Sequence, residues 1–248
     1  MPRFSASGRG LHAPWTDPIV RVAREATPFL LIALALVPLA AWLGGTTAAI
    51  VAILPAILVL FFFRDPPRAV PAGPGLVLAP ADGRIVDLRT VDDETFPGGT
   101  ARRVSIFLSI FNVHINRAPV CGEVSGVVYR RGRFRAAFHG KASEENERNR
   151  IDLATPEGPV AMTQIAGAIA RRIVCDVSPG DRVRAGQRVG LIRFGSRVDL
   201  ILPVHWHLDV SVGTRVRACR TVMARTAGKA ARPGAAAGAE QEVAVAPS

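Results

Sequence analysis

Residues 177–199 read VSPGDRVRAGQRVGLIRFGSRVD. Short runs of valine, leucine and isoleucine alternate there with glycine, proline and aspartate, so the stretch predicts short β-strands joined by tight turns. The same pattern recurs upstream, for example at residues 83–88, 103–110 and 122–130. It predicts a mainly β (α+β) fold with a sandwich-like or barrel-like sheet. Residues 141–150 differ, because their polar composition predicts a helix.

The Gly195-Ser196 pair within this stretch is a candidate for self-cleavage. A serine hydroxyl can attack the carbonyl carbon of the preceding residue when that residue is glycine, which has no side chain to block the approach and tolerates strained backbone angles. An N-to-O acyl shift and β-elimination would release a chain ending at Gly195 and convert Ser196 into a pyruvoyl group. Gly-Ser is also an ordinary turn pair, so the dipeptide alone leaves a simple turn open.

The N-terminal part contains an uncharged apolar run, residues 26–63. One membrane-spanning helix needs about 20 residues. A Gly-Gly-Thr-Thr sequence at 44–47 divides the run into two halves of about 16 residues, or about 24 Å each as helices. The run therefore predicts a hydrophobic helical membrane hairpin at 26–65, either as two short spans or as a re-entrant loop. A cleavable signal peptide is the rival interpretation, but the run starts too late and is too long for one.

Charge patterns place this hairpin at the cell membrane. Arg21 and Arg24 precede the apolar run and Arg64 and Arg68 follow it, so the positive-inside rule puts both flanks, and the catalytic domain, on the cytoplasmic side. The net charge of +11 fits either nucleic acid or anionic lipid. An apolar run in the same chain favours lipid, so we expect no nucleic-acid partner.

The chain divides into four parts by composition. We expect an N-terminal lead at 1–25, the hairpin at 26–65, a β domain at 76–226 after a Pro- and Gly-rich linker, and a disordered tail at 227–248. The three cysteines have no C-x-x-C spacing, which argues against a disulfide framework and a zinc site. His205 and His207 share one face of a predicted strand, but no third ligand is evident nearby, so we expect a polar strand face and no metal.

Self-cleavage at Ser196 needs a base, and histidine is the natural candidate. His114 follows a hydrophobic strand, and its apolar neighbours could hold an imidazole at the edge of a core. The residues alone leave a purely structural histidine open. Asp82 precedes a glycine, and Asp-Gly is a preferred hairpin turn, so a structural role is open for this carboxylate as well.

Arginines recur at positions 131, 133 and 135. In an extended segment they would line one face, and each basic group near an anionic leaflet contributes about 1 kcal/mol. A solvated strand edge is the alternative. Glutamates 144, 145 and 147 are better explained as a solvated helical face than as acid catalysts.

Residues 177–199 resemble, almost residue for residue, the self-cleavage segment of phosphatidylserine decarboxylase proenzymes of the short bacterial and archaeal type. The resemblance extends to four upstream segments in the family's order and covers roughly residues 55–220. These segments are Phe61-Phe62-Phe63-Arg64-Asp65-Pro66, Pro80-Ala81-Asp82-Gly83, Asn112-Val113-His114-Ile115-Asn116-Arg117-Ala118-Pro119 and Lys141-Ala142-Ser143-Glu144-Glu145-Asn146-Glu147-Arg148-Asn149.

The resemblance implies a membrane-associated enzyme of phospholipid biosynthesis that decarboxylates phosphatidylserine to phosphatidylethanolamine and CO2. The cofactor would be the pyruvoyl group made from Ser196, which forms a Schiff base with the substrate amine, and no metal is expected. Cleavage between Gly195 and Ser196 would leave a β chain, 1–195, and an α chain, 196–248, as a heterodimer, with a higher oligomer left open.

The resemblance also implies roles for individual side chains. His114 and Asp82 match the histidine and aspartate that act with the serine as a charge-relay set. Arg117 departs from the pattern of some longer relatives, which carry a second histidine at this position; it could instead meet the substrate carboxylate or phosphate as a bidentate donor. The remaining substrate-binding candidates are Arg131, Arg133 and Arg135.

Two other functions share some of these features. Residues 179–187 and 79–83 look like the turn repeats of lipoyl- or biotinyl-type domains, so a membrane-anchored adaptor or carrier is one alternative. The expected lysine at the hairpin tip is missing, however. An ordinary serine hydrolase built on Ser196 and His114 would lack the G-x-S-x-G nucleophile elbow.

Overall fold

The computed structural model describes residues 20–132, 146–167, 172–193 and 196–226. In this part of the chain the N-terminal elements are β1 (Arg21–Val22), the 3-10 helix η1 (Arg24–Ala26), α1 (Thr27–Phe62) and β2 (Arg64–Asp65). The first half of the β domain contains β3 (Leu76–Leu78), β4 (Gly83–Asp92), the 3-10 helix η2 (Pro97–Gly99), β5 (Thr100–Leu108), β6 (Ile115–Arg117) and β7 (Gly122–Arg130). The second half contains β8 (Arg148–Thr155), β9 (Gly158–Ile165), β10 (Ile173–Cys175), β11 (Arg182–Val183), β12 (Arg188–Ile192), β13 (Ser196–Pro203), β14 (His207–Leu208), β15 (Arg215–Val216) and β16 (Val222–Arg225).

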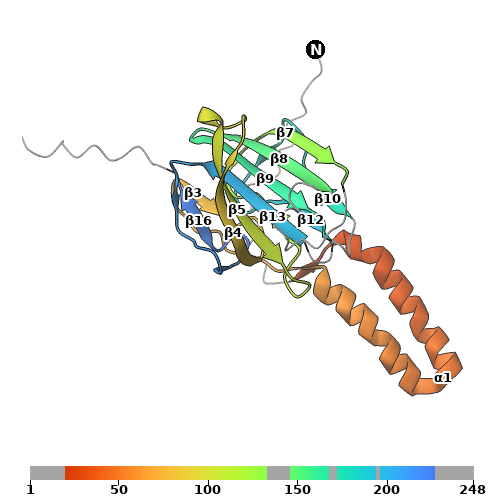
Figure 1. Ribbon diagram of the computed structural model, residues 1–248. Coiled ribbons are helices and arrows are strands. Elements are labelled where there is room, and N and C mark those ends of the chain that lie inside the picture. Colours follow the sequence, from red (N-terminus) through yellow and green to blue (C-terminus); the bar gives the residue numbers. More distant parts are fainter. Residues whose placement is uncertain (1–19, 133–145, 168–171, 194–195, 227–248) are drawn as a thin grey trace, which may run out of the picture.

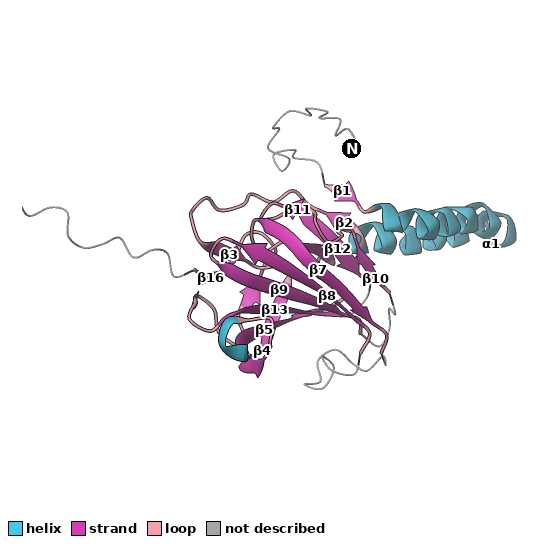
Figure 2. Ribbon diagram, turned by 90° about the horizontal axis from the view of Figure 1, so that it is seen from above, coloured by secondary structure: helices cyan, strands magenta, loops and turns pink. Residues whose placement is uncertain are grey.

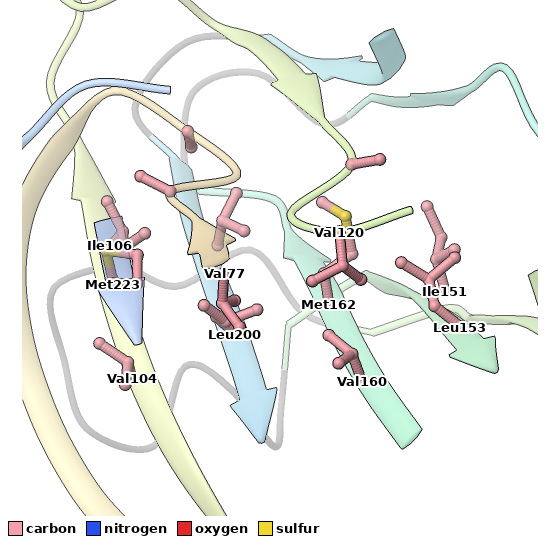
Figure 3. Close-up of a cluster of buried hydrophobic side chains, with 14 of the residues drawn as sticks. Val77, Val104, Ile106, Val120, Ile151, Leu153, Val160, Met162, Leu200 and Met223 are labelled. Carbon is pink, nitrogen blue, oxygen red and sulfur yellow. The ribbon is translucent and has the colours of Figure 1, made fainter. Parts of the chain in front are cut away.

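The main body is a curled antiparallel sheet of eight strands in the order β11-β7-β8-β9-β13-β5-β4-β15 (Figures 1 and 2). Two three-stranded sheets, β10-β12-β6 and β14-β16-β3, accompany it. The small sheet β14-β16-β3 shares one hydrophobic core with the large sheet (Figure 3): Val77 and Met223 pack with Ile106, Leu200 and Met162. The prediction of a mainly β fold is therefore confirmed, whereas the lipoyl-like turn repeats stay a prediction.

The prediction of a helix at residues 141–150 is wrong for residues 148–150, which form the beginning of a strand. Arg148 begins strand β8, whose side chains alternate between half-buried and buried, with Asn149 and Ile151 inside. Burial of every second side chain is typical of a strand. The sequence did not show this alternation, because one of the inward-facing residues is a polar asparagine. Residues 133–145, with Glu144 and Glu145, lie outside the described residues.

Helix α1 is interrupted at Gly45, which has the non-helical angles φ 68° and ψ −164°. The rings of Phe29 and Phe63 stack with their centroids 5.7 Å apart, so the beginning and the end of the apolar segment meet. Figure 1 shows the two arms of α1 side by side, projecting from the β domain. Residues 24–62 are long and apolar enough to cross a membrane, and large apolar side chains such as Trp42 and Leu43 are 82% and 70% exposed.

The two ends of α1, where it meets the β domain, pack on the small sheet β10-β12-β6. The hydrophobic contacts join Phe62 and Phe63 to Val113, Ile115 and Leu191. Strand β5 ends and strand β13 begins on the side of the domain from which α1 projects (Figure 1). The apolar helix and this end of the large sheet are therefore neighbours.

Candidate active site

Ser196 is the first residue of β13 and pairs with Leu108, the last residue of β5. Side chains alternate along a strand, so Ser196 shares the inward face of Val198 and Leu200, both in the hydrophobic core. Its side chain is fully buried, and Oγ has no hydrogen-bond partner within the described structure. A buried hydroxyl without a partner is costly, which marks it as a functional candidate. Gly195, on the other side of the predicted cleavage site, lies outside the described residues.

His114 lies in the connection between β5 and β6, and its ring is fully buried. Its Nδ1 is 2.9 Å from the carbonyl oxygen of Asn112. A carbonyl only accepts, so Nδ1 carries the proton and Nε2 of the neutral ring holds a lone pair. This Nε2 is buried and has no partner among the described residues.

The charge state of His114 follows from its surroundings. Burial lowers the pKa of the ring to about 4, against the opposing effect of the Asn112 hydrogen bond. The nearby Arg64 lowers this pKa further, and Asp82 raises it. The ring of Phe62, at the end of α1, lies 4.2 Å from the His114 ring and contributes to the apolar environment. At neutral pH His114 is thus an uncharged base with a free lone pair.

Two features of the backbone link the segments that carry Ser196 and His114. The loop that carries His114 leaves β5 directly after Leu108, the residue that pairs with Ser196. On the other side, the backbone N–H of Ile192 donates to the His114 carbonyl at 3.3 Å, four residues before Ser196. Both predicted catalytic residues therefore lie at the same end of the large sheet.

Asp82 immediately precedes β4, the strand that pairs with β5 on the side opposite β13. Its Oδ2 accepts from Arg68 at 2.7 Å and its Oδ1 accepts from the backbone N–H of Ala218 at 2.8 Å. Within the described structure, the group that bonds Nδ1 of His114 is a backbone carbonyl and not this carboxylate. Asp82 acts on His114 through its charge, and its role as orienting carboxylate stays a prediction.

A chain of buried amides runs beside the histidine. Asn149 donates to Oε1 of Gln164 at 3.0 Å, and Gln164 donates to Oδ1 of Asn116 at 2.9 Å. All three side chains are at most 2% exposed, and Nδ2 of Asn116 has no partner among the described residues. Gln164 pairs through its backbone with Val198, two residues after Ser196. The sequence pattern did not indicate this network, because neutral amides carry no distinctive spacing.

A cavity of about 980 Å³ opens at the same end of the sheet, with Gly83 and Phe107 in its wall. Six arginines line it: Arg64, Arg68, Arg84, Arg215, Arg217 and Arg220. Asp82 is the one acidic residue among its lining residues. We call this space the arginine cavity.

Of the four substrate-binding arginines predicted from the sequence, the structure describes Arg117 and Arg131. Arg117 is 3% exposed, forms an ion pair with Asp65 and donates to the Gly186 carbonyl at 2.9 Å. Arg131 is exposed just beyond the end of β7. Neither lines the arginine cavity, and Arg133 and Arg135 lie outside the described residues. Within the described residues no group of three His, Cys, Asp or Glu side chains could hold a metal ion.

Comparison with known proteins identifies one family. The family model described as phosphatidylserine decarboxylase matches residues 56–224. The phosphatidylserine decarboxylase proenzyme of Nitrosomonas europaea is 50% identical over 204 residues, which are 82% of this chain and 94% of the relative. That of Desulfotalea psychrophila is 45% identical over 208 residues, 84% and 97% of the two chains. The phosphatidylserine decarboxylase proenzyme of Burkholderia cenocepacia is 46% identical over 204 residues, which are 82% of this chain and 95% of the relative.

Proposed function

Because this chain belongs to the phosphatidylserine decarboxylase family, we propose that it cuts itself between Gly195 and Ser196 and then decarboxylates phosphatidylserine to phosphatidylethanolamine. The observation that carries this proposal is a pair of buried side-chain atoms at one end of the sheet that have no hydrogen-bond partner among the residues the structure describes. One is Oγ of Ser196 and the other is Nε2 of the neutral His114. A hydroxyl that must lose a proton and a lone pair that can take it are the two parts that self-cleavage requires.

The proposed self-cleavage begins when Oγ of Ser196 attacks the carbonyl carbon of Gly195 while Nε2 of His114 takes the hydroxyl proton. The peptide C–N bond breaks, and His114 returns the proton to the nitrogen of residue 196, which leaves an ester. Loss of the Cα proton and cleavage of the Cβ–Oγ bond then release Gly195 as a carboxylate. Hydrolysis of the remaining dehydroalanine releases ammonia and leaves a pyruvoyl group at the new N-terminus of the chain 196–248.

The position of residue 196 suits a pyruvoyl group. The side chain is fully buried on the inward face of β13, beside apolar residues that exclude bulk water. When present, the group supplies an electrophilic ketone that forms a Schiff base with the substrate amine and accepts electrons as CO2 leaves. The buried site would protect that ketone from water, and the chains 1–195 and 196–248 would stay together because β13 pairs on both sides with strands of the first chain.

Membrane association is part of the same proposal. The apolar side chains of α1 are exposed along both arms, and both ends of the helix return to the β domain. Burying those side chains in lipid is the favourable way to remove them from water. Arg21, Arg24, Arg64 and Arg68 flank the helix, so we propose a hairpin inserted into the cell membrane from the cytoplasmic side.

Intact mass spectrometry of the purified protein tests the proposal. The wild-type chain should yield two fragments that meet at Gly195 and Ser196, and the second should react with a carbonyl reagent such as a hydrazide. Ser196→Ala should remain one chain without decarboxylase activity, whereas Ser125→Ala, which alters an exposed serine of β7, should cut and turn over lipid normally. A single uncut wild-type chain that still decarboxylates phosphatidylserine would refute the mechanism.

A further inference from the structure

The arginine cavity carries a strong excess of positive charge. Within the described residues only Arg68 of its six arginines has a carboxylate partner, Asp82. Arg64 and Arg84 donate to backbone carbonyls, of Phe111 at 2.7 Å and of Gly213 at 2.9 Å, and neither forms an ion pair within the described part of the chain. Arg215, Arg217 and Arg220 are exposed along the last strands of the domain. Guanidinium groups gathered in a cavity with one carboxylate favour an anionic ligand.

The cavity lies at the end of the large sheet where Ser196 begins β13, and it also adjoins the end of the apolar helix; Ser196 and His114 themselves are not among its lining residues. Its wall residue Phe107 pairs with Arg197, the residue after Ser196, so the two lie on neighbouring strands about 5 Å apart. At its other side Arg64 and Pro66 directly follow the end of α1. A lipid with its acyl chains beside α1 would therefore present its headgroup to the cavity.

We propose that the arginine cavity binds the phosphodiester group of the phosphatidylserine headgroup, an inference that rests on the proposed function. This headgroup has two anions, the phosphodiester and the carboxylate that departs as CO2. Cations placed on the carboxylate would stabilise the substrate more than the transition state, in which that charge is being lost. Cations placed on the phosphodiester hold substrate and transition state equally, so they strengthen binding without slowing the reaction.

Direct binding to the uncut chain tests the cavity without the pyruvoyl group. Calorimetric titration of the Ser196→Ala chain with glycerophosphoserine, the headgroup without acyl chains, should show binding. Replacing both Arg217 and Arg220 with glutamine should weaken that binding about tenfold or more, because each guanidinium provides a charge-assisted hydrogen bond. The side chains of both residues are exposed, so their loss should not disturb the fold.

A matched control separates the cavity from general electrostatic attraction. Arg182 and Arg184, on and next to the edge strand β11, are also exposed and do not line the cavity. Replacing both with glutamine removes the same charge and should leave the affinity for glycerophosphoserine unchanged. Equal losses in the two double variants would overturn the proposal, and so would equally tight binding of free serine, which has no phosphate.

Kinetics identify the source of the bound phosphate. In the processed enzyme the change at Arg217 and Arg220 should raise KM for glycerophosphoserine about tenfold with little change in kcat, as expected for binding shared by substrate and transition state. Weaker binding with an unchanged KM would mean that the cavity holds free phosphate or a second lipid, and would overturn the assignment to the substrate. Intact mass should show normal cutting in both double variants, so a failure of self-cleavage, which would refute the proposed function, is a separate result.

Discussion

Self-cleavage should respond to pH at an acidic point, because it depends on the neutral form of a deeply buried histidine. Burial lowers the pKa of His114 to about 4. At pH 7 only about one ring in a thousand is then protonated. We expect the rate of cutting, with respect to this group, to be nearly constant from about pH 5 to pH 8 and to fall about tenfold for each unit below pH 4.

The same shift makes the folded proenzyme less stable in acid. Between pH 6.5 and pH 4 the ring binds a proton in the unfolded chain but not in the folded chain, so stability falls as the pH falls through this window. A shift of about 2.5 units corresponds to about 3 kcal/mol. Urea denaturation of the uncut Ser196→Ala chain at pH 7.5 and at pH 4.5 should show most of this loss of unfolding free energy. The same measurements identify the pH range in which the chain stays folded.

Rates are then measured only within that range. Radiolabelled chain made by cell-free synthesis is transferred to buffers of different pH, and the uncut chain and its two products are followed on gels. His114→Gln should abolish cutting, whereas His205→Gln, which alters an exposed histidine, should not. A midpoint near 6.5 would show that the ring is solvated, and normal cutting by His114→Gln would show that another group is the base.

Three further substitutions, with Gly126→Ala as a control away from the site, test the packing of the β domain. Gly83→Ala would place a Cβ 2.2 Å from a carbonyl oxygen of β5 and should lower the unfolding free energy by about 1–3 kcal/mol in thermal denaturation. The control Gly126→Ala, whose Cβ would lie 3.4 Å from its nearest neighbour, should change the unfolding free energy by less than about 1 kcal/mol. Gln164→Leu would remove the hydrogen-bond partner that Asn149 and Asn116 share and should cost about 2–5 kcal/mol in urea denaturation. Asp82→Asn would leave the guanidinium of Arg68 unpaired in a site where it is 8% exposed, and about 3–5 kcal/mol should be lost, more than for an exposed carboxylate.

The strands were predictable from sequence where alternation and turn chemistry act locally. Residues 83–88 and 103–110 were expected as strands, and both lie largely within β4 and β5. Arg148 and Asn149 were missed, because their strand conformation depends on pairing with β7 and β9 and not on their own polar composition. Local propensity is overridden wherever cross-strand packing supplies most of the energy.

The candidate site was predictable in its residues but not in its contacts. Ser196 and His114 were indicated by motif, and the fold places them at one end of the sheet. The partner of His114 was not predictable, because a backbone carbonyl, that of Asn112, has no sequence signature. The arginine cavity was missed for a similar reason: Arg64 and Arg217 are 153 positions apart in the sequence, and only the tertiary fold brings them to one cavity.

The two proposed reactions make different demands on this one end of the domain. Self-cleavage needs a neutral base and a buried hydroxyl, both of which come from the chain itself, so it requires neither lipid nor the arginine cavity. In the proposed lipid turnover, the arginine cavity would additionally hold the headgroup and α1 would contact the acyl chains; Arg64, near the end of α1, lines the cavity. Asn112 and Val113, the residues directly before His114, line the cavity, but the His114 ring itself is fully buried and packs against Phe62. A solvated ring would regain a higher pKa and would already carry a proton at acidic pH, so it could not act as a base there. Substitution of the exposed cavity residues Arg217 and Arg220 should therefore leave self-cleavage intact and weaken only the binding of substrate.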